Sequence, residues 1–151
     1  MIGPEGVILL AEDGEGDIKL IADAFRRAKI LNQLLVVKNG QEAVDYIEGR
    51  GKYSERTKWP LPALLLLDLM MPGLDGFGVL EWIRRRPEYN NLIVVVLTMY
   101  NESRNIERAY RMGANSFLVK PQNFDGFEEI ALLLVQFWFK HNLTTEREAR
   151  R

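Results

Sequence analysis

The stretch LLLLDLMMPGLDG, residues 64–76, decides the fold of this chain. Its four consecutive leucines predict a strand buried on both faces, because a strand with one wet face would alternate apolar and polar residues. The strand ends on Asp68, a charge that protein interiors disfavour. Met71 and Pro72 then turn the chain away. We therefore expect Asp68 at the open end of a central strand, with its carboxylate exposed for chemistry.

Other apolar runs of similar character predict the remaining strands. Together the predicted strands cover residues 7–10, 34–37, 63–67, 92–97 and 117–119. Apolar residues at helical spacing predict helices over residues 18–28, 41–48, 76–86, 102–112 and 124–140. This alternation predicts a doubly wound α/β fold, a five-stranded parallel sheet with helices on both faces. We expect one domain over residues 1–142, a frayed charged tail over 143–151 and no effector domain.

Composition and charge exclude several classes of function. The 151 residues are 47% hydrophobic and 27% charged, which suffices for an ordinary core. The 20 basic and 21 acidic side chains nearly cancel, so these totals indicate neither nucleic acid nor a membrane surface as partner. The absence of cysteine excludes disulfides, thiolate zinc sites and cysteine nucleophiles. Without a signal peptide or an apolar stretch of about 20 residues, a cytoplasmic protein is expected.

Polar side chains follow four of the predicted strands, at the point where each strand ends. Glu12 and Asp13 follow the first strand, Asp68 the third, Thr98 the fourth and Lys120 the fifth. Ligands of open α/β sheets bind beyond the carboxyl ends of the strands. Three carboxylates there repel one another unless a cation intervenes, and oxygen ligands suit Mg²⁺. With a lysine and a hydroxyl to hold phosphoryl oxygens, the set predicts a phosphoryl-transfer site in which a carboxylate can act as nucleophile.

The motifs around these residues resemble those of the response-regulator receiver domains of two-component signalling. The matching motifs are AED at 11–13, DLMMPGLDG at 68–76, LTM at 97–99 and GANSFLVKP at 113–121. The resemblance covers roughly residues 7–140, which is nearly the whole chain. It implies the flavodoxin-like, CheY-like strand order 2-1-3-4-5.

The resemblance implies a role for each site residue. Asp68 would accept a phosphoryl group from a phosphohistidine on a sensor histidine kinase or a phosphotransfer protein. Glu12, Asp13 and Asp68 would bind Mg²⁺, with the main-chain carbonyl of Met70 as a further ligand. Lys120 would contact the phosphoryl group. A protein of this kind catalyses only its own phosphorylation and dephosphorylation, and it signals by protein contact.

The resemblance also implies a conformational switch. Thr98 would supply the hydroxyl that moves to hydrogen-bond a phosphoryl oxygen. Phe117 would be the aromatic side chain that swings inward on activation. The resemblance further allows a cis bond between Lys120 and Pro121, since X–Pro bonds tolerate the cis form.

Three bulky side chains occupy positions where the family tunes the access of water to the phospho-aspartate. They are Met70, Met99 and Tyr100, and the position of Met99 is usually small in the family. Our hypothesis is that the phosphorylated form hydrolyses slowly, because apolar bulk excludes attacking water. A second hypothesis is that Met99 obstructs phosphotransfer.

Two further segments indicate partners. The loop bearing Tyr53 and Trp59, and the last predicted helix, which ends in QFWFK, are similar to those of the small stand-alone regulators that work with phytochromes. Beside its core face, the last helix has a second apolar surface, formed by Leu132, Leu133, Val135, Phe137 and Phe139. That surface predicts a homodimer through the helices over 102–112 and 124–140 and the strand over 117–119.

Two smaller features have structural interpretations. Trp59 lies near two prolines and is interpreted as the anchor of its loop, with contact to a partner as the alternative. The basic run Arg84–Arg85–Arg86 is interpreted as a solvated helix end, which the helix dipole favours.

Three alternative functions stay open. A phosphatase of the haloacid-dehalogenase kind would carry a second acid two residues after its nucleophile, where this chain has Met70. A flavodoxin would need a phosphate loop rich in Ser, Thr and Gly after the first strand, where Glu12 and Asp13 would repel phosphate. A receiver scaffold that signals without phosphorylation is kept open by Met99.

Overall fold

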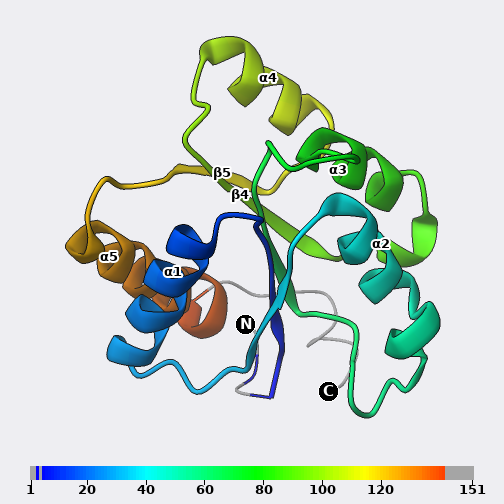
Figure 1. Cartoon of the computed structure of the whole chain (residues 1–151), viewed down its shortest axis with the longest axis horizontal. Helices are drawn as coiled ribbons and strands as arrows, with labels where there is room; N and C mark the ends of the chain where they lie inside the picture. Colours follow the sequence, from blue (N-terminus) through cyan, green and yellow to red (C-terminus); the bar gives the residue numbers. More distant parts are fainter. Residues whose placement is uncertain (1–2, 4, 142–151) are drawn as a thin grey trace.

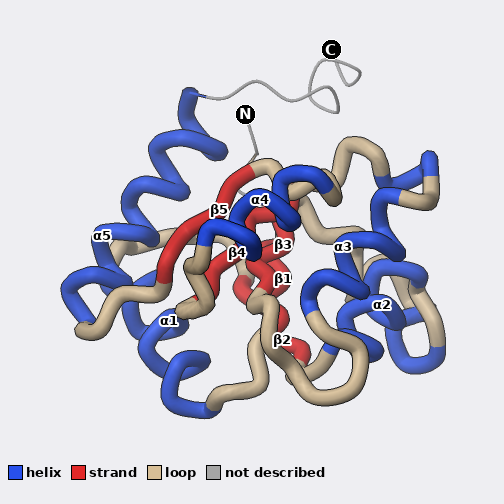
Figure 2. The backbone as a smooth tube through the Cα atoms, turned by 90° about the horizontal axis from the view of Figure 1, so that it is seen from above, coloured by secondary structure: helices blue, strands red, loops and turns tan. Residues whose placement is uncertain are grey.

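The strands of the chain form one parallel sheet, as predicted. The computed structural model describes residue 3 and residues 5–141, so the tail expected over 143–151 lies outside the described residues. The strands are β1 (Ile8–Ala11), β2 (Leu34–Val37), β3 (Leu64–Leu67), β4 (Ile93–Thr98) and β5 (Ser116–Val119). They pair in parallel in the order β2-β1-β3-β4-β5. Figure 2 shows them side by side between two groups of helices.

Helices cover both faces of this sheet (Figure 1). The α-helices of the described residues are α1 (Glu15–Arg27), α2 (Gly40–Glu48), α3 (Gly76–Arg84), α4 (Ser103–Arg111) and α5 (Phe124–Leu134). Helices α1 and α5 pack together on one face, and α2 and α3 pack together on the other. Within the part of the chain that the structure describes, none of these helices is both long and apolar enough to cross a membrane.

The core lies on both sides of β3. Leu65 and Leu67 pack into the cluster that α2 and α3 complete, whereas Leu64 and Leu66 pack into the cluster that α1 and α5 complete. None of the four leucines is more than 1% exposed. This two-sided burial is the reason why the strand is an unbroken apolar run rather than an alternating one.

The connection between α2 and β3 is held in place by aromatic packing. Tyr53 is buried in a short 3₁₀ helix (Gly51–Ser54), and its ring centroid lies 4.9 Å from that of Tyr46. The Trp59 ring meets Tyr53 edge-on at 5.3 Å. Arg56 donates hydrogen bonds to the main-chain carbonyls of Tyr46 and Trp59 at 2.7 and 2.9 Å. Trp59 therefore anchors its loop, as predicted.

Helices α3 and α5 end two or more residues earlier than predicted. Helix α3 ends at Arg84, because Pro87 restricts the residue before it: Arg86 is extended, with φ −109° and ψ 112°. Helix α5 ends at Leu134, and the chain continues as a π-helix over Val135–His141. Helical structure thus spans the predicted region, in the wider π form at its end.

Arg84 does not lie in a solvated helix end, so that part of the interpretation is wrong. Its guanidinium donates hydrogen bonds to the carbonyls of Gly113 and Leu92, both at 2.9 Å, and to Oδ1 of Asn115 at 3.0 Å. The same Asn115 oxygen accepts a 2.8 Å hydrogen bond from the N–H of Val94. Arg84 therefore joins the end of α3 to β4 and to the loop before β5, which its position in the sequence does not reveal.

Candidate functional site

The sheet brings the predicted site residues to one edge. Glu12 follows β1 and Asp68 follows β3, and the N–H of Asp68 donates to the Ala11 carbonyl at 3.1 Å. Thr98 ends β4, and its carbonyl accepts a 2.8 Å hydrogen bond from the N–H of Lys120, just after β5. Because the strands are parallel, their carboxyl ends share this edge.

Three carboxylates meet there. One oxygen from each of Glu12, Asp13 and Asp68 lies within 4.8 Å of the others. Glu12 and Asp68 are buried, whereas Asp13 is exposed. Oε1 of Glu12 is buried and pairs with the Lys120 ammonium. All the possible ligand atoms of this cluster are oxygens, and the negative charge of its carboxylates exceeds the positive charge nearby. These residues therefore fit a hard divalent cation.

Lys120 is the cation that the chain itself places in this cluster. Its side chain is 7% exposed, and Nζ lies 2.9 Å from Oδ2 of Asp68 and 2.8 Å from Oδ2 of Asp17. Nζ also contacts Glu12. Burial disfavours the charged ammonium, but the hydrogen bonds to Asp17, Glu12 and Asp68 outweigh it and raise the pKa of Lys120 above its ordinary value.

The environment also perturbs Glu12. Burial raises the pKa of Glu12 to about 7, opposed by the hydrogen bond from Lys120 and reinforced by repulsion from Asp68. In the absence of a metal ion, Glu12 is therefore easy to protonate near neutral pH. A divalent cation at the cluster would favour its ionised form.

The expectation of an exposed Asp68 carboxylate is wrong. Its side chain is 6% exposed, because the Lys120 ammonium closes over one of its oxygens. The other oxygen, Oδ1, accepts a long hydrogen bond of 3.4 Å from the N–H of Met70. Of the two Asp68 oxygens, Oδ1 is therefore the one that Lys120 does not contact.

Asp17 is a member of the site that the sequence interpretation missed. It lies in α1, and its contact with Lys120 joins residues 103 positions apart. One signal was available: Asp17 follows Asp13 by four residues, which places both near one face at the start of a helix. That spacing alone does not identify a lysine as the partner.

The two predicted switch residues lie on the neighbouring strands β4 and β5. Thr98 is fully buried, and its Oγ1 accepts a 3.4 Å hydrogen bond from the N–H of Tyr100. Phe117 is half-buried and packs against the cluster of α2 and α3. Its N–H donates to the hydroxyl of Tyr110, in α4, at 3.1 Å. Tyr110 therefore ties α4 to the edge strand β5.

The three bulky access residues lie on the surface. The exposed fractions are 48% for Met70, 62% for Met99 and 37% for Tyr100. Met99 is the residue after the buried Thr98, so it lies at the rim of the site and does not fill the interior.

The turn after Asp68 depends on a glycine. The N–H of Gly76 donates to the Leu69 carbonyl at 2.8 Å, and a Cβ at position 76 would lie 2.3 Å from the Asp68 carbonyl oxygen. Only glycine permits this approach of α3 to the end of β3. On the other side of the site, the Lys120–Pro121 bond is trans and not cis, which is the form that X–Pro bonds prefer.

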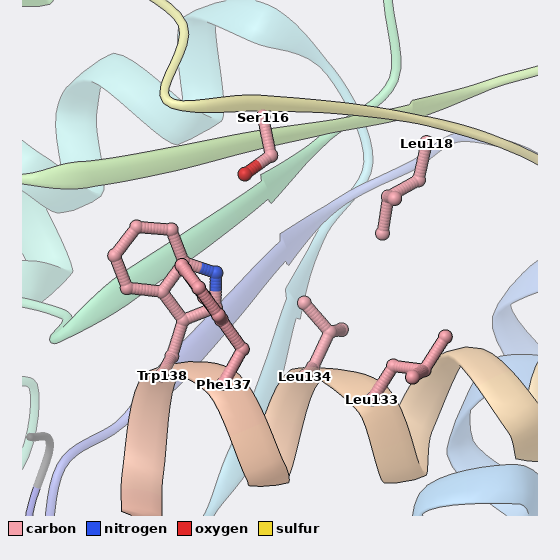
Figure 3. Close-up of a pocket in the computed structure, with 6 residues that line it drawn as sticks. All are labelled: Ser116, Leu118, Leu133, Leu134, Phe137 and Trp138. Atoms are coloured by element: carbon pink, nitrogen blue, oxygen red, sulfur yellow. The ribbon is translucent and has the colours of Figure 1, made fainter. Parts of the chain in front are cut away.

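A second, apolar hollow lies away from this edge, between β5 and α5 with its π-helical extension (Figure 3). Its volume is about 230 Å³. The lining side chains are Ser116, Leu118, Leu133, Leu134, Phe137 and Trp138. Leu133 and Phe137 are more than half exposed, at 54% and 53%. The predicted second apolar surface of the last helix is therefore present as far as the described side chains reach; the Phe139 side chain lies outside them.

The fold and the edge site together define a class of protein. A parallel sheet in this order, with clustered carboxylates and a buried lysine at its carboxyl edge, has the architecture of CheY-like receivers. The family model described as "Response regulator receiver domain" matches residues 8–131. The chain belongs to this family.

Relatives cover nearly the whole chain. The chain is 30% identical over 137 residues to the response regulator Rcp1 of Synechocystis sp., and the similarity spans 91% of each protein. It is 33% identical over 139 residues to the probable methanogenesis regulatory protein FilR2 of Methanothrix harundinacea, across 90% of this chain and 85% of that protein.

Solved structures of response regulators superpose closely on this chain. The response regulator RPA3017, in red light signaling of R. palustris, has a TM-score of 0.87 and 35% identity over 92% of this chain and 97% of its own. The phosphorylated cyanobacterial phytochrome response regulator RcpA has a TM-score of 0.86 and 29% identity, with 93% and 99% covered. The Mn²⁺-bound form of Rcp1 has a TM-score of 0.82 and 29% identity, with 92% and 98% covered.

Proposed function

We propose that this chain is a phosphorylation switch, in which Asp68 accepts a phosphoryl group from a phosphohistidine of a sensor histidine kinase or a phosphotransfer protein. An Asp68 oxygen forms a bond to phosphorus while the bond from phosphorus to the histidine nitrogen breaks, and that electron pair leaves with the imidazole. The observation that carries the proposal is the Asp68 carboxylate at the end of the central strand, between a lysine ammonium and two further carboxylates. The switch acts by protein contact and turns over no other substrate.

Mg²⁺ is the cation that we propose for the acidic cluster. Glu12, Asp13 and Asp68 would hold it, with the main-chain carbonyl of Met70 as a further ligand. When bound, the ion would neutralise negative charge on the carboxylates and on the phosphoryl oxygens. The meeting of three carboxylates, two of them buried, beside a single lysine ammonium supports this proposal, as does the Mn²⁺-bound form of the similar Rcp1.

Three residues would change their contacts when the phosphoryl group binds. The Lys120 ammonium would exchange its hydrogen bond to the Asp68 oxygen for one to a phosphoryl oxygen. Thr98 would donate its hydroxyl hydrogen to another phosphoryl oxygen, and the 3.4 Å hydrogen bond that its Oγ1 accepts from Tyr100 is long enough to give way to such a movement. Phe117 is half-buried, so an inward swing would bury more of its ring.

Met70, Met99 and Tyr100 would slow the hydrolysis of the phosphorylated form by keeping water away from it. Their place at the surface of the site is compatible with this role, since a rim of apolar atoms can exclude water without occupying the site. An obstruction of phosphotransfer by Met99 would be weak, because a flexible and exposed methionine can move aside.

We propose a phytochrome as the sensor kinase that donates the phosphoryl group. The transfer would take place in the cytoplasm, where ATP is available to kinases. The proposal is supported by similarity to RcpA and RPA3017, whose descriptions name a phytochrome and red light signaling. FilR2 carries a different description at similar identity, so the donor has to be identified by experiment.

A homodimer through α4, β5 and α5 is the assembly that we propose. The apolar hollow between β5 and the last helical segment is lined in part by the exposed side chains of Phe137 and Leu133. A two-fold axis would let each copy insert Phe137 toward the hollow of the other, since such an interface is self-complementary. Tyr110 and Val119, 49% and 45% exposed, would extend the contact along α4 and β5.

The phosphorylation proposal is tested by intact-mass measurement after incubation with acetyl phosphate and Mg²⁺. We expect the wild-type chain to gain the mass of one phosphoryl group and the Asp68→Asn variant to gain none. Asp125→Asn, which removes an exposed carboxylate from the first turn of α5, is the matched control and should gain the group normally.

Two other outcomes of this experiment would replace the proposal. Turnover of a chromogenic phosphate ester without a mass gain would indicate the phosphatase, which the presence of Met70 in place of a second acid disfavours. Neither a mass gain nor turnover would indicate a scaffold that signals without phosphorylation. In phosphorylated samples, the decay of the added mass with time measures the rate of hydrolysis.

A further inference from the structure

Asp17 is the one carboxylate on Lys120 that does not belong to the acidic cluster within the described residues. Nζ of Lys120 contacts Glu12, Asp17 and Asp68. Glu12 and Asp68 also belong to the group of carboxylates that meet within 4.8 Å, together with Asp13, and Asp17 does not. Lys120 therefore contacts two carboxylates of the acidic cluster and one carboxylate, that of Asp17, outside it.

A cation and a phosphoryl group would compete for two of these contacts. A metal ion at the cluster would draw on the oxygens of Glu12 and Asp68, and the phosphoryl group would cover Asp68 itself. The contact with Asp17, 2.8 Å long, is the one that neither ligand needs to break. Asp17 is therefore suited to hold Lys120 while the other two carboxylates change partners.

Lys120 needs such an anchor for a physical reason. A lysine ends in a compact ammonium on a flexible four-carbon stem, and it takes no fixed direction of its own. This ammonium is buried, and a buried charge that loses its partners is strongly disfavoured. One fixed hydrogen bond restricts Nζ to a small region beside Asp68 and so keeps it ready for a phosphoryl oxygen.

We propose that Asp17 is a positioning residue of the phosphoryl-acceptor site, which acts by holding the Lys120 ammonium in place while Mg²⁺ and the phosphoryl group engage the other carboxylates. The inference rests on the proposed function of Asp68, because positioning of Lys120 matters only if a phosphoryl group arrives there. Asp17 touches neither the metal ligands nor the phosphoryl group in this proposal.

The first test is the rate of phosphorylation by acetyl phosphate in Mg²⁺, followed by intact mass. We expect Asp17→Asn to lower the rate about tenfold, because small errors of position are costly in group transfer. Asp17→Glu keeps the carboxylate and should recover part of the rate. The matched control is Glu15→Gln, which removes a charge two residues away in α1, from a side chain that is 76% exposed and paired with Lys38.

The second test separates positioning from a general effect of charge or stability. In a Lys120→Ala background, Asp17→Asn should cause no further loss of rate, since its target is gone. An equal loss in both backgrounds, or an equal loss from Glu15→Gln, would overturn the proposal. So would an unchanged rate in Asp17→Asn.

The third test does not depend on phosphorylation. In Mg²⁺-loaded protein, the ¹⁵N resonance of the Lys120 ammonium should be sharp in the wild type and in Glu15→Gln, and broadened in Asp17→Asn. If the wild type takes up no phosphoryl group, the proposed function of Asp68 fails while this resonance still reports on the anchor. A resonance that stays equally sharp in all three proteins refutes the anchor itself.

Discussion

Arg84 shows at the residue scale how one side chain joins distant segments. Its guanidinium is half-buried, and burial lowers the pKa of Arg84, yet an arginine remains charged at any physiological pH. Its hydrogen bonds to the carbonyls of Gly113 and Leu92 are charge-assisted, which makes them stronger than neutral ones. Loss of the guanidinium would leave these carbonyls to find new partners.

We expect Arg84→Ala to lower the free energy of unfolding by about 2–4 kcal/mol, because several hydrogen bonds to a charged group disappear together. The control is Arg85→Ala in the next position. Arg85 is exposed and pairs with Glu81 on the same helix, so its loss should change stability by less than about 1 kcal/mol. Urea denaturation of both variants measures the difference, and equal losses would contradict the prediction.

Helix α5 serves two purposes at the element scale. In α5 and its π-helical extension, Phe127, Ala131 and Trp138 are buried, whereas Leu133 and Phe137 remain more than half exposed and line an apolar hollow. A helix that is apolar over more than its core face is typical of an interface. The exposed Phe137 ring is itself part of the lining of the hollow, so the same few residues can offer both halves of a symmetric contact (Figure 3).

We expect Phe137→Glu to weaken the proposed homodimer by about 100-fold or more in Kd. A two-fold interface contains this ring twice, and burial of each phenylalanine contributes about 1.5–3 kcal/mol. Leu31→Glu adds the same charge at a residue that is 86% exposed in the loop between α1 and β2, outside the proposed interface, and it should leave the dimer intact. Sedimentation at tens of micromolar measures both variants, and a monomeric wild type would remove the assembly from consideration.

The repulsion among the clustered carboxylates is a property of the whole molecule, because different strands bring them together. The parallel order of the strands directs the carboxylates of Glu12, Asp13 and Asp68 to one edge of the sheet, with Lys120 among them. Burial there raises the pKa of Glu12 to about 7, from 4.5 in its ordinary state. The folded chain therefore holds a proton on Glu12 over a range of pH in which the unfolded chain has released it.

We expect the free energy of unfolding to fall as the pH rises from about 4.5 to about 7 in a chelating buffer, by up to about 1.4 kcal/mol per pH unit. The sign follows because the folded state binds more protons than the unfolded state in that range. Urea denaturation at several pH values measures the slope. Glu12→Gln should lose this component, and Mg²⁺ should reduce it by stabilising the ionised carboxylate.

The exposed Glu107 of α4 offers the control for this slope. Glu107→Gln removes one exposed carboxyl group that is not part of the cluster, and it should retain the wild-type dependence on pH. A Glu12→Gln variant with an unchanged slope would mean that another group binds the proton.

Much of the site could be predicted because its residues follow strands. Asp68, Glu12 and Lys120 each end an apolar run, and parallel strands bring such ends together. The burial of Asp68 could not be predicted, since it depends on where the Lys120 side chain reaches. Asp17 and Arg84 were missed for the same reason, as their partners lie far away along the chain.

The sequence by itself determined the succession of strands and helices along the chain. The faces that a segment must bury set its local periodicity or its unbroken apolar run, and these patterns are visible in the sequence. It also determined the strand-end carboxylates and the lysine. Only the tertiary structure decided which side chains share Lys120, what Arg84 holds together and where α5 leaves an apolar hollow. These contacts depend on the packing of segments that no local pattern relates, so they exist only when the whole sheet has assembled.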